Sequence, residues 1–172
     1  MKKPTIAAVL LVALLLWACP AQEQDLWPGI TQAKVQRVVD GDTFVLENGE
    51  RVRFIGVNAP EMATKPPNPP KPAEPGAEAA TKFTRDKVEG KTVWLEAEGN
   101  DRDRYGRLRR YVWLSQPTNP DDENQIRKHQ LNALLLSNGH AVVLRVEKMK
   151  NETLFRQLEK EGKGKKAANR QP

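Results

Sequence analysis

The hydrophobic pattern between residues 35 and 57 predicts three β-strands. Val35, Val38 and Val39 lead into a turn at Asp40-Gly41-Asp42, and Phe44 and Leu46 then alternate with Val45. Asn48-Gly49, a dipeptide typical of tight hairpins, separates Thr43–Leu46 from a second apolar run at Arg51–Val57. We therefore expect these two strands to pair antiparallel, with their register fixed by the Asn-Gly turn.

Helical and strand-like patterns follow in turn along the rest of the chain. We expect a helix over residues 77–90 that Gly90 ends, a strand over 91–99 and a strand over 108–114. A second helix is expected from a cap near Asp121 to Asn138-Gly139, and a third over 151–163. The order of three strands, helix, two strands, helix, helix predicts an α+β, mainly β fold, a five-stranded OB-fold Greek-key barrel with three α-helices.

The first residues have the pattern of a bacterial export signal. Lys2 and Lys3 precede an apolar stretch that is too short to cross a bilayer comfortably, so residues 1–18 are interpreted as a signal peptide. Cys19, the single cysteine, ends a segment that resembles a lipobox, which predicts a lipidated, membrane-anchored protein of the cell envelope. The alternative is ordinary cleavage, for example after Ala21, which would give a secreted or periplasmic protein.

Composition divides the remaining chain into a tether, a domain and a tail. We expect a tether over residues 19–32, one domain over 33–160 and a basic flexible tail over 161–172. The formal charge of +6 suits a polyanionic partner but does not identify one. Six prolines between Pro66 and Pro75 predict an extended surface loop, and a proline-rich docking ligand is the alternative reading.

Three polar clusters stand where strands end and turns begin. They are Asp40–Thr43, Arg53 with Asn58–Glu61, and Asp103–Arg107. Acidic oxygens can hold a hard cation, arginines can bind a phosphate, and a glutamate can deprotonate a water. Each cluster alone could be a turn, a solvated loop or a structural ion pair. Together they indicate metal-assisted hydrolysis of a phosphodiester.

The segments VDGDTFVL, RFIGVNAPE and DRYGR together resemble the staphylococcal nuclease (thermonuclease) family, over roughly Val35 to Leu158. The resemblance implies an OB-type barrel with three helices and a Ca²⁺-dependent hydrolase of DNA and RNA that leaves 3′-phosphate ends. It also implies a preference for single-stranded substrates, and we expect a monomer.

The same resemblance implies roles for individual residues. Arg53 matches the arginine that binds the phosphate and the transition state, and Arg107 matches a second arginine that stabilises the transition state or assists the leaving group. Glu61 matches the glutamate proposed as general base towards water. Asp42 matches a direct calcium ligand, and Asp40 matches an outer-shell acid near the metal.

Other positions match only in part. Asn58 stands where the family normally has an aspartate ligand, and Ala59 where a threonine donates its backbone carbonyl to the metal. Because Asn58 removes one negative charge, we expect weaker calcium binding than with aspartate. Arg104 and Tyr105 lie where the family contacts a nucleotide phosphate. Family members present nucleotide-packing tyrosines at the positions of Arg145 and Glu147, so base preference is expected to differ.

Two other functions remain open at this point. One is a non-catalytic nucleic-acid-binding OB-fold module of the cell envelope, which Asn58 and the missing tyrosines favour. The other is an envelope interaction protein that uses the proline-rich loop. His129 and His140 lie outside the three clusters, and we interpret both as structural or surface residues.

Overall fold

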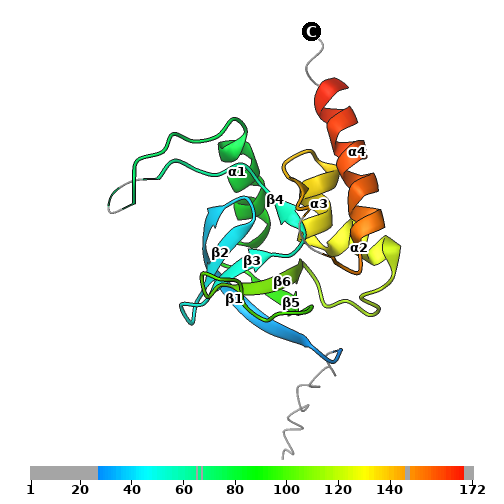
Figure 1. Cartoon of the computed structure of the whole chain (residues 1–172). Helices are drawn as coiled ribbons and strands as arrows, with labels where there is room; N and C mark the ends of the chain where they lie inside the picture. The colour runs from blue at the N-terminus through cyan, green and yellow to red at the C-terminus, as the bar shows by residue number, and fades with distance from the viewer. Residues whose placement is uncertain (1–26, 65, 67, 146–147, 169–172) are drawn as a thin grey trace, which may run out of the picture.

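A closed barrel of five strands forms the centre of the computed structural model, which describes residues 27–64, 66, 68–145 and 148–168 (Figure 1). The strand order is β1–β2–β3–β6–β5; β3 and β6 pair in parallel and the other neighbours pair antiparallel. This confirms the predicted OB-type barrel. The barrel strands are β1 Ile30–Asp40, β2 Thr43–Leu46, β3 Arg51–Phe54, β5 Thr92–Glu96 and β6 Leu108–Trp113.

The predicted hairpin is present with the register that the turn implies. Thr43 of β2 stands opposite Arg53 of β3, and Phe44 stands opposite Val52. Gly49 has φ +85°, a conformation that glycine adopts without a steric penalty. The domain begins slightly earlier than residue 33, because β1 starts at Ile30 and pairs with β5 from its first residue.

Helices cover the open end and one side of the barrel (Figure 1). The barrel interior is apolar and includes an edge-to-face pair, Phe44 and Phe54, whose ring centroids are 5.4 Å apart. Phe155 of the last helix is fully buried and meets Tyr111 of β6 in the same way. The helices of the described residues are α1 Ala77–Val88, α2 Glu123–His129, α3 Leu131–Ser137 and α4 Glu152–Ala168.

The prediction of a single helix between residues 121 and 138 was wrong. Gln130 is extended, with ψ 118°, and it divides the segment into α2 and α3. Its backbone forms a bridge with Trp113, and the amide of Leu114 donates to the carbonyl of His129 at 2.8 Å. The break therefore allows the backbone at the end of β6 to form hydrogen bonds with residues 129–130. A hydrophobic pattern at helical spacing does not reveal such a break.

The predicted strand from Arg51 to Val57 is also divided. β3 ends at Phe54, and Gly56 turns the chain with φ +74°. The next two residues form β4 Val57–Asn58, which pairs with β7 Val142–Val143 in a separate two-stranded sheet. The side chain of Asn132 supports this turn by donating to the carbonyl of Ile55 at 2.9 Å. Asn58 therefore stands outside the barrel wall that carries Arg53.

The last helix continues beyond its predicted end. Residues 161–168 belong to α4 and do not form the flexible tail expected from residue 161, while residues 169–172 lie outside the described part of the chain. A Cβ built on Gly162 would overlap the carbonyl oxygen of Leu136, so α4 and α3 are in backbone contact there. Arg127 of α2 also pairs with Glu161 at 3.2 Å. These contacts hold the added turns of α4 in place.

The predicted signal peptide and Cys19 lie within residues 1–26, outside the described residues. Within the part of the chain that the structure describes, no helix has the length and apolar character needed to cross a membrane.

Candidate active site

The Asp-Gly-Asp turn between β1 and β2 is held in place from two sides. A Cβ built on Gly41 would lie 2.6 Å from the Cβ of Ala59 and 2.8 Å from that of Ala80, so only glycine fits. The hydroxyl of Thr84 on α1 donates to the carbonyl of Gly41 at 2.6 Å. The two carboxylates of the turn, Asp40 and Asp42, are thereby carried on a rigid support.

Asp42 is the centre of a network that joins two of the predicted clusters. Its Oδ2 lies 2.6 Å from Nη1 of Arg53 and accepts a hydrogen bond from the amide of Ala59, also at 2.6 Å. Its Oδ1 accepts from the hydroxyl of Thr43 at 3.0 Å. Nη2 of Arg53 donates to Oδ1 of Asn58 at 2.9 Å. The structure therefore brings Asp42, Arg53, Asn58 and Ala59 together, as the sequence predicted.

The contact between Arg53 and Asp42 is an ion pair rather than an aligned hydrogen bond. Nη1 is buried and has no hydrogen-bond partner of good geometry among the described residues, although the carboxylate is 2.6 Å away. The side chains of Arg53 and Asp42 are 14% and 7% exposed, so the two charges attract each other with little screening by water. The carboxylate of Asp42 therefore holds Nη1 in place and fixes the orientation of the guanidinium group.

Asp40 lies next to this network and is difficult to ionise. Burial raises its pKa to about 7, and the negative charge of Asp42 contributes in the same direction. The amide of Asp42 donates to Oδ1 of Asp40 at 3.2 Å, which fixes the two carboxyl groups as neighbours. A cation placed between them would relieve this repulsion.

The Asp103–Arg107 loop is organised by its first residue. Oδ1 of Asp103 accepts hydrogen bonds from the amides of Tyr105 at 2.9 Å and Arg107 at 3.0 Å, and Gly106 makes the turn with φ +78°. Oδ2 of Asp103 lies 2.7 Å from Nε of Arg107. Burial would raise the pKa of Asp103, but the hydrogen bonds from Arg107 and Tyr105 outweigh it, and the pKa is lowered.

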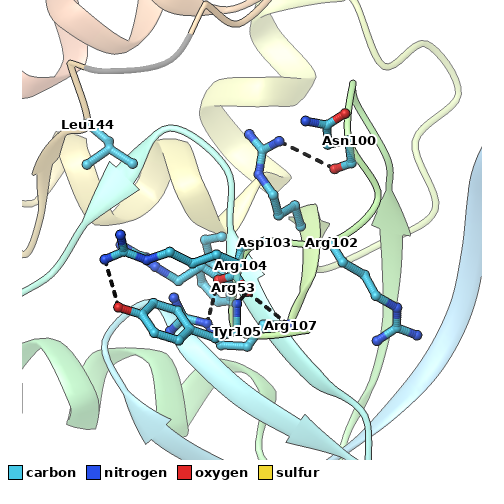
Figure 2. A pocket seen from close by; sticks show the side chains of 10 residues that line it. Arg53, Asn100, Arg102, Asp103, Arg104, Tyr105, Arg107 and Leu144 are labelled. Atoms are coloured by element: carbon cyan, nitrogen blue, oxygen red, sulfur yellow. Dashed lines mark hydrogen bonds and ion pairs between the residues drawn. The ribbon is translucent and has the colours of Figure 1, made fainter.

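Arg53 and Arg107 meet in one cavity of about 510 Å³. Figure 2 shows Arg53, Arg104 and Arg107 gathered around Tyr105, with Leu144 on the opposite side. The guanidinium carbons of Arg104 and Arg107 lie 4.8 Å and 5.4 Å from the centroid of the Tyr105 ring, and Tyr105 is 67% exposed. Strand β3 and a loop distant from it in sequence thus build one positively charged cavity with an accessible aromatic ring.

Glu61 does not line this cavity, and its side chain is 60% exposed. It lies at the base of the proline-rich loop, where Nζ of Lys71 contacts its Oε2 at 3.1 Å and Oε1 of Glu74 at 2.9 Å. The amide of Glu74 donates to the carbonyl of Glu61, and Thr64 forms a bridge with Lys71. Glu61, the predicted general base, therefore lies in a loop that these contacts hold in place, and outside the cavity of Arg53 and Arg107.

Comparison with known proteins identifies the family. The model of the family described as staphylococcal nuclease homologue matches residues 51–168, more than two thirds of the chain. The chain belongs to the staphylococcal nuclease family. The family predicted from the three motifs is therefore confirmed.

Curated relatives of this nuclease-family chain come from two bacterial genera. The chain is 43% identical over 83 residues to thermonuclease of Staphylococcus intermedius, which covers 46% of this chain and 47% of that protein. It is 34% identical over 126 residues to thermonuclease of Staphylococcus hyicus, covering 66% and 72%. It is 37% identical over 89 residues to endonuclease YncB of Bacillus subtilis strain 168, covering 49% and 40%. The match to the first relative thus spans about half of that protein's length.

The oxygen donors of the site fit the hard cation that the staphylococcal nuclease family implies. Asp40, Asp42 and Asn58 offer carboxylate and amide oxygens, the ligands that Ca²⁺ prefers. Burial, and next to it the charge of Asp42, raises the pKa of Asp40, and a cation bound there would stabilise its ionised form. The set contains two carboxylates and one amide. Among the described residues there is accordingly no cluster of three or more His, Cys, Asp or Glu side chains that could hold a metal ion. The amide of Ala59 faces Asp42, and the metal-binding role of its carbonyl stays a prediction.

Sequence reasoning gave no orienting role to two residues that hold the predicted ones, although it had included Asp103 in one of the three clusters. Asp103 fixes Arg107, and the Asp-x-x-x-Arg spacing within a glycine turn was the available signal. Lys71 holds Glu61 across ten positions of a proline-rich segment, and no local pattern indicates that pairing. His140 is half-buried and its ring lies 4.6 Å from that of Phe83, in line with the predicted structural role.

Proposed function

We propose that this chain is a Ca²⁺-dependent nuclease that hydrolyses phosphodiester bonds of DNA and RNA and leaves 3′-phosphate ends. The observation that carries the proposal is the shared cavity of Arg53 and Arg107, joined through Arg53 to the carboxylate of Asp42. Membership of the staphylococcal nuclease family supports the enzyme class, as do relatives named thermonuclease and endonuclease.

The two arginines would bind and neutralise the phosphate that is attacked. Arg53 is held by Asp42 and Asn58, and Arg107 is held by Asp103, so both guanidinium groups are oriented before substrate arrives. Donors that are already oriented stabilise charge as it develops in the transition state, without a reorganisation cost. Tyr105 offers an exposed ring on which a base could stack, since Arg145 and Glu147 replace the stacking tyrosines expected in the family.

Glu61 would act as the general base towards the attacking water. Its side chain is largely exposed and bound to Lys71 through a solvent-screened contact, which is weak enough to break when substrate and water occupy the site. The carboxylates of Asp40 and Asp42 and the amide oxygen of Asn58 would hold the metal. Calcium held by these residues would supply positive charge near the phosphate.

A cleavage assay with defined metal tests the proposal. Labelled single-stranded DNA and RNA are incubated with the purified protein in a calcium titration and in chelator, and the product ends are analysed for 3′-phosphate. We expect cleavage that depends on calcium and a preference for single strands. Glu61→Gln should lower kcat on the order of 10²-fold or more.

Two outcomes would contradict the proposal. Absence of cleavage with calcium and with every other divalent metal would exclude a metal-dependent nuclease. An unchanged rate in Glu61→Gln, with a folded protein confirmed by circular dichroism, would remove Glu61 from the mechanism while leaving the arginines in place.

A nucleic-acid-binding module without turnover is the second candidate. The observation in its favour is that two carboxylates, rather than three, stand at the metal site. The arginine cavity would then serve binding alone. Tight, salt-dependent binding of oligonucleotides with no hydrolysis in any divalent metal would favour this function.

We also propose that the chain is exported and anchored by lipid at Cys19. This rests on the sequence of residues 1–19 and concerns residues outside the described part of the chain. Mass spectrometry of the mature N-terminus separates the two export routes. An acylated Cys19 that disappears in Cys19→Ser supports anchoring, and an unmodified N-terminus after Ala21 supports secretion.

A further inference from the structure

Two adjoining cavities are lined by residues of α1, α4 and β4 and of the segment that follows α3; Figure 1 shows where these elements lie. Their volumes are about 400 Å³ and 200 Å³. The smaller one reaches Asn58 and the larger one reaches Lys165. We call them together the α3–α4 groove, defined by the four residues that line both cavities: Pro60, Gly139, His140 and Lys166.

Close packing of α4 against α3 places one lysine across this groove. Gly162 touches the backbone at Leu136 and Gly139, and Lys166 follows four residues later on the same face of the helix. The Cβ of Lys166 lies 3.5 Å from a Cβ built on Gly139, and its Nζ lies 3.8 Å from one built on Gly76. The lysine therefore spans the groove from the end of α3 to the start of α1.

This end of α4 carries two neighbouring positive charges, those of Lys165 and Lys166. No carboxylate of the described residues forms an ion pair with Lys165 or Lys166. Their acidic neighbours on α4 are already engaged, since Glu159 pairs with Lys163 at 3.0 Å and Glu161 pairs with an arginine of α2.

Among the described residues, Glu74 is the carboxylate that lines the groove, and it too is engaged. Oε1 of Glu74 lies 2.9 Å from Nζ of Lys71, and its Oε2 accepts from the amide of Glu61 at 3.2 Å. Burial lowers the pKa of His140, and the positive charge of Lys166 acts in the same direction. The groove therefore carries a net positive charge.

Asn58 connects the groove to the candidate active site. It lines the smaller cavity and accepts a hydrogen bond from Arg53, which lines the arginine cavity. A polymer whose phosphate lies at Arg53 can therefore continue past Asn58 into the groove. A small phosphate ester bound at Arg53 would not reach it.

We propose that the α3–α4 groove binds the phosphate backbone of the nucleic-acid strand at nucleotides beyond the scissile bond, with Lys165 and Lys166 as its cations. The proposal rests on the proposed nuclease function and adds a subsite for polymeric substrate. It also assigns a role to the basic end of the chain, which the three motifs leave without one.

Binding of oligonucleotides of two lengths tests the subsite. Dissociation constants of a dinucleotide and of a 20-nucleotide single-stranded DNA are measured in chelator at several salt concentrations. For Lys165→Ala/Lys166→Ala we expect the affinity for the longer DNA to fall on the order of tenfold at low salt. Its salt slope should decrease by about 1.4, the value for two lost phosphate contacts on a single strand. Dinucleotide binding should be unchanged.

Matched variants test whether the loss of affinity comes from the groove or from the removal of positive charge anywhere on the protein. Lys128→Ala/Lys160→Ala removes two exposed lysines that lie outside the groove and form no ion pair with any described residue, and it should bind like wild type. Lys165→Arg/Lys166→Arg keeps the charge and should retain most of the affinity. Equal losses in the control pair, equal losses for both DNA lengths, or no loss at all would each overturn the proposal.

Failure of the subsite and failure of the nuclease function give different results. Binding in chelator does not require turnover, so it reports on the groove even if calcium yields no cleavage. If the lysine pair affects binding to anionic lipid vesicles and leaves oligonucleotide affinity unchanged, the groove serves a membrane surface and the proposal is wrong.

Discussion

Nη1 of Arg53 lies 2.6 Å from Oδ2 of Asp42, so the arginine expected to bind phosphate is in contact with the carboxylate expected to bind metal. Both side chains are largely buried, and the amide oxygen of Asn58 completes the contact by accepting from Nη2 of Arg53. A change of charge at any of these three positions therefore alters both phosphate binding and metal binding.

Asn58→Asp should tighten calcium binding. The substitution restores a carboxylate beside Arg53 and Asp42, and calcium affinity rises with the charge of its ligands, so we expect a calcium midpoint lower on the order of tenfold. The midpoint is measured by calorimetry and by calcium titration of cleavage. Asn100→Asp is the matched control, since it adds the same charge to the arginine cavity away from the carboxylate pair. A shift of the same size in both variants would show that Asn58 is not a ligand.

Asp103→Asn should lower kcat about tenfold through Arg107. The amide can still accept from the backbone of Tyr105 and Arg107, but the charged contact to Nε of Arg107 is lost. The rate is measured in saturating calcium, with KM expected to change less than kcat. Asp101→Asn is the control, because Asp101 pairs with Arg110 at 2.5 Å and does not hold Arg107. A wild-type kcat in Asp103→Asn would show that the role of Arg107 does not depend on its contact with Asp103.

The stability that Asp103 contributes should depend on pH in the acidic range. Its pKa is lowered in the folded protein, so the unfolded chain binds its proton at a higher pH than the native state does. The contribution is therefore complete above the ordinary pKa of 3.8 and is lost as the pH falls below it. Urea unfolding should show wild type more stable than Asp103→Asn by about 1 kcal/mol at pH 6, with the difference vanishing towards pH 2. A difference that persists at the lower pH would contradict this cause.

Lys71→Met should release Glu61 with little effect on stability. The Lys71–Glu61 pair is exposed and screened by water, so its loss should leave the urea unfolding midpoint nearly unchanged. A freed Glu61 reaches the water more readily, and we expect kcat to rise about twofold. Lys82→Met, which breaks an exposed pair with Asp86 on α1, should leave kcat unchanged. A fall in kcat for Lys71→Met would instead show that Lys71 holds Glu61 in its productive position.

Two glycines of α4 should respond in opposite directions to alanine. A Cβ on Gly162 would overlap the backbone of Leu136 and Gly139, so Gly162→Ala should destabilise the protein by about 1–3 kcal/mol. A Cβ on Gly164 meets nothing within 4 Å, so Gly164→Ala should stabilise the helix by up to about 1 kcal/mol. Thermal unfolding compares the two. Similar effects of both substitutions would show that α4 does not dock closely on α3.

Much of the fold and of the site could be predicted from local sequence. The Asn48-Gly49 hairpin, the Asp-Gly-Asp turn and the end of α1 near Gly90 depend on residues close in the chain, and the structure contains all three. The family motifs identified Arg53, Asp42 and Asn58, which lie in contact. The break at Gln130 could not be predicted, because it satisfies the backbone of β6, which is distant in sequence.

The sequence by itself determined the five barrel strands, the family and the set of charged residues available for chemistry, because periodicity, turn dipeptides and motifs are local properties of the chain. The tertiary structure alone decided which partner each of these residues has. It paired Lys71 with Glu61 and Arg107 with Asp103, and it brought Lys166 and Asn58 to the same cavity. The physical reason is that such pairings depend on how closely the helices and loops pack on the barrel. Side-chain volume and backbone contact set the spacing between these elements, as at Gly41 and Gly162.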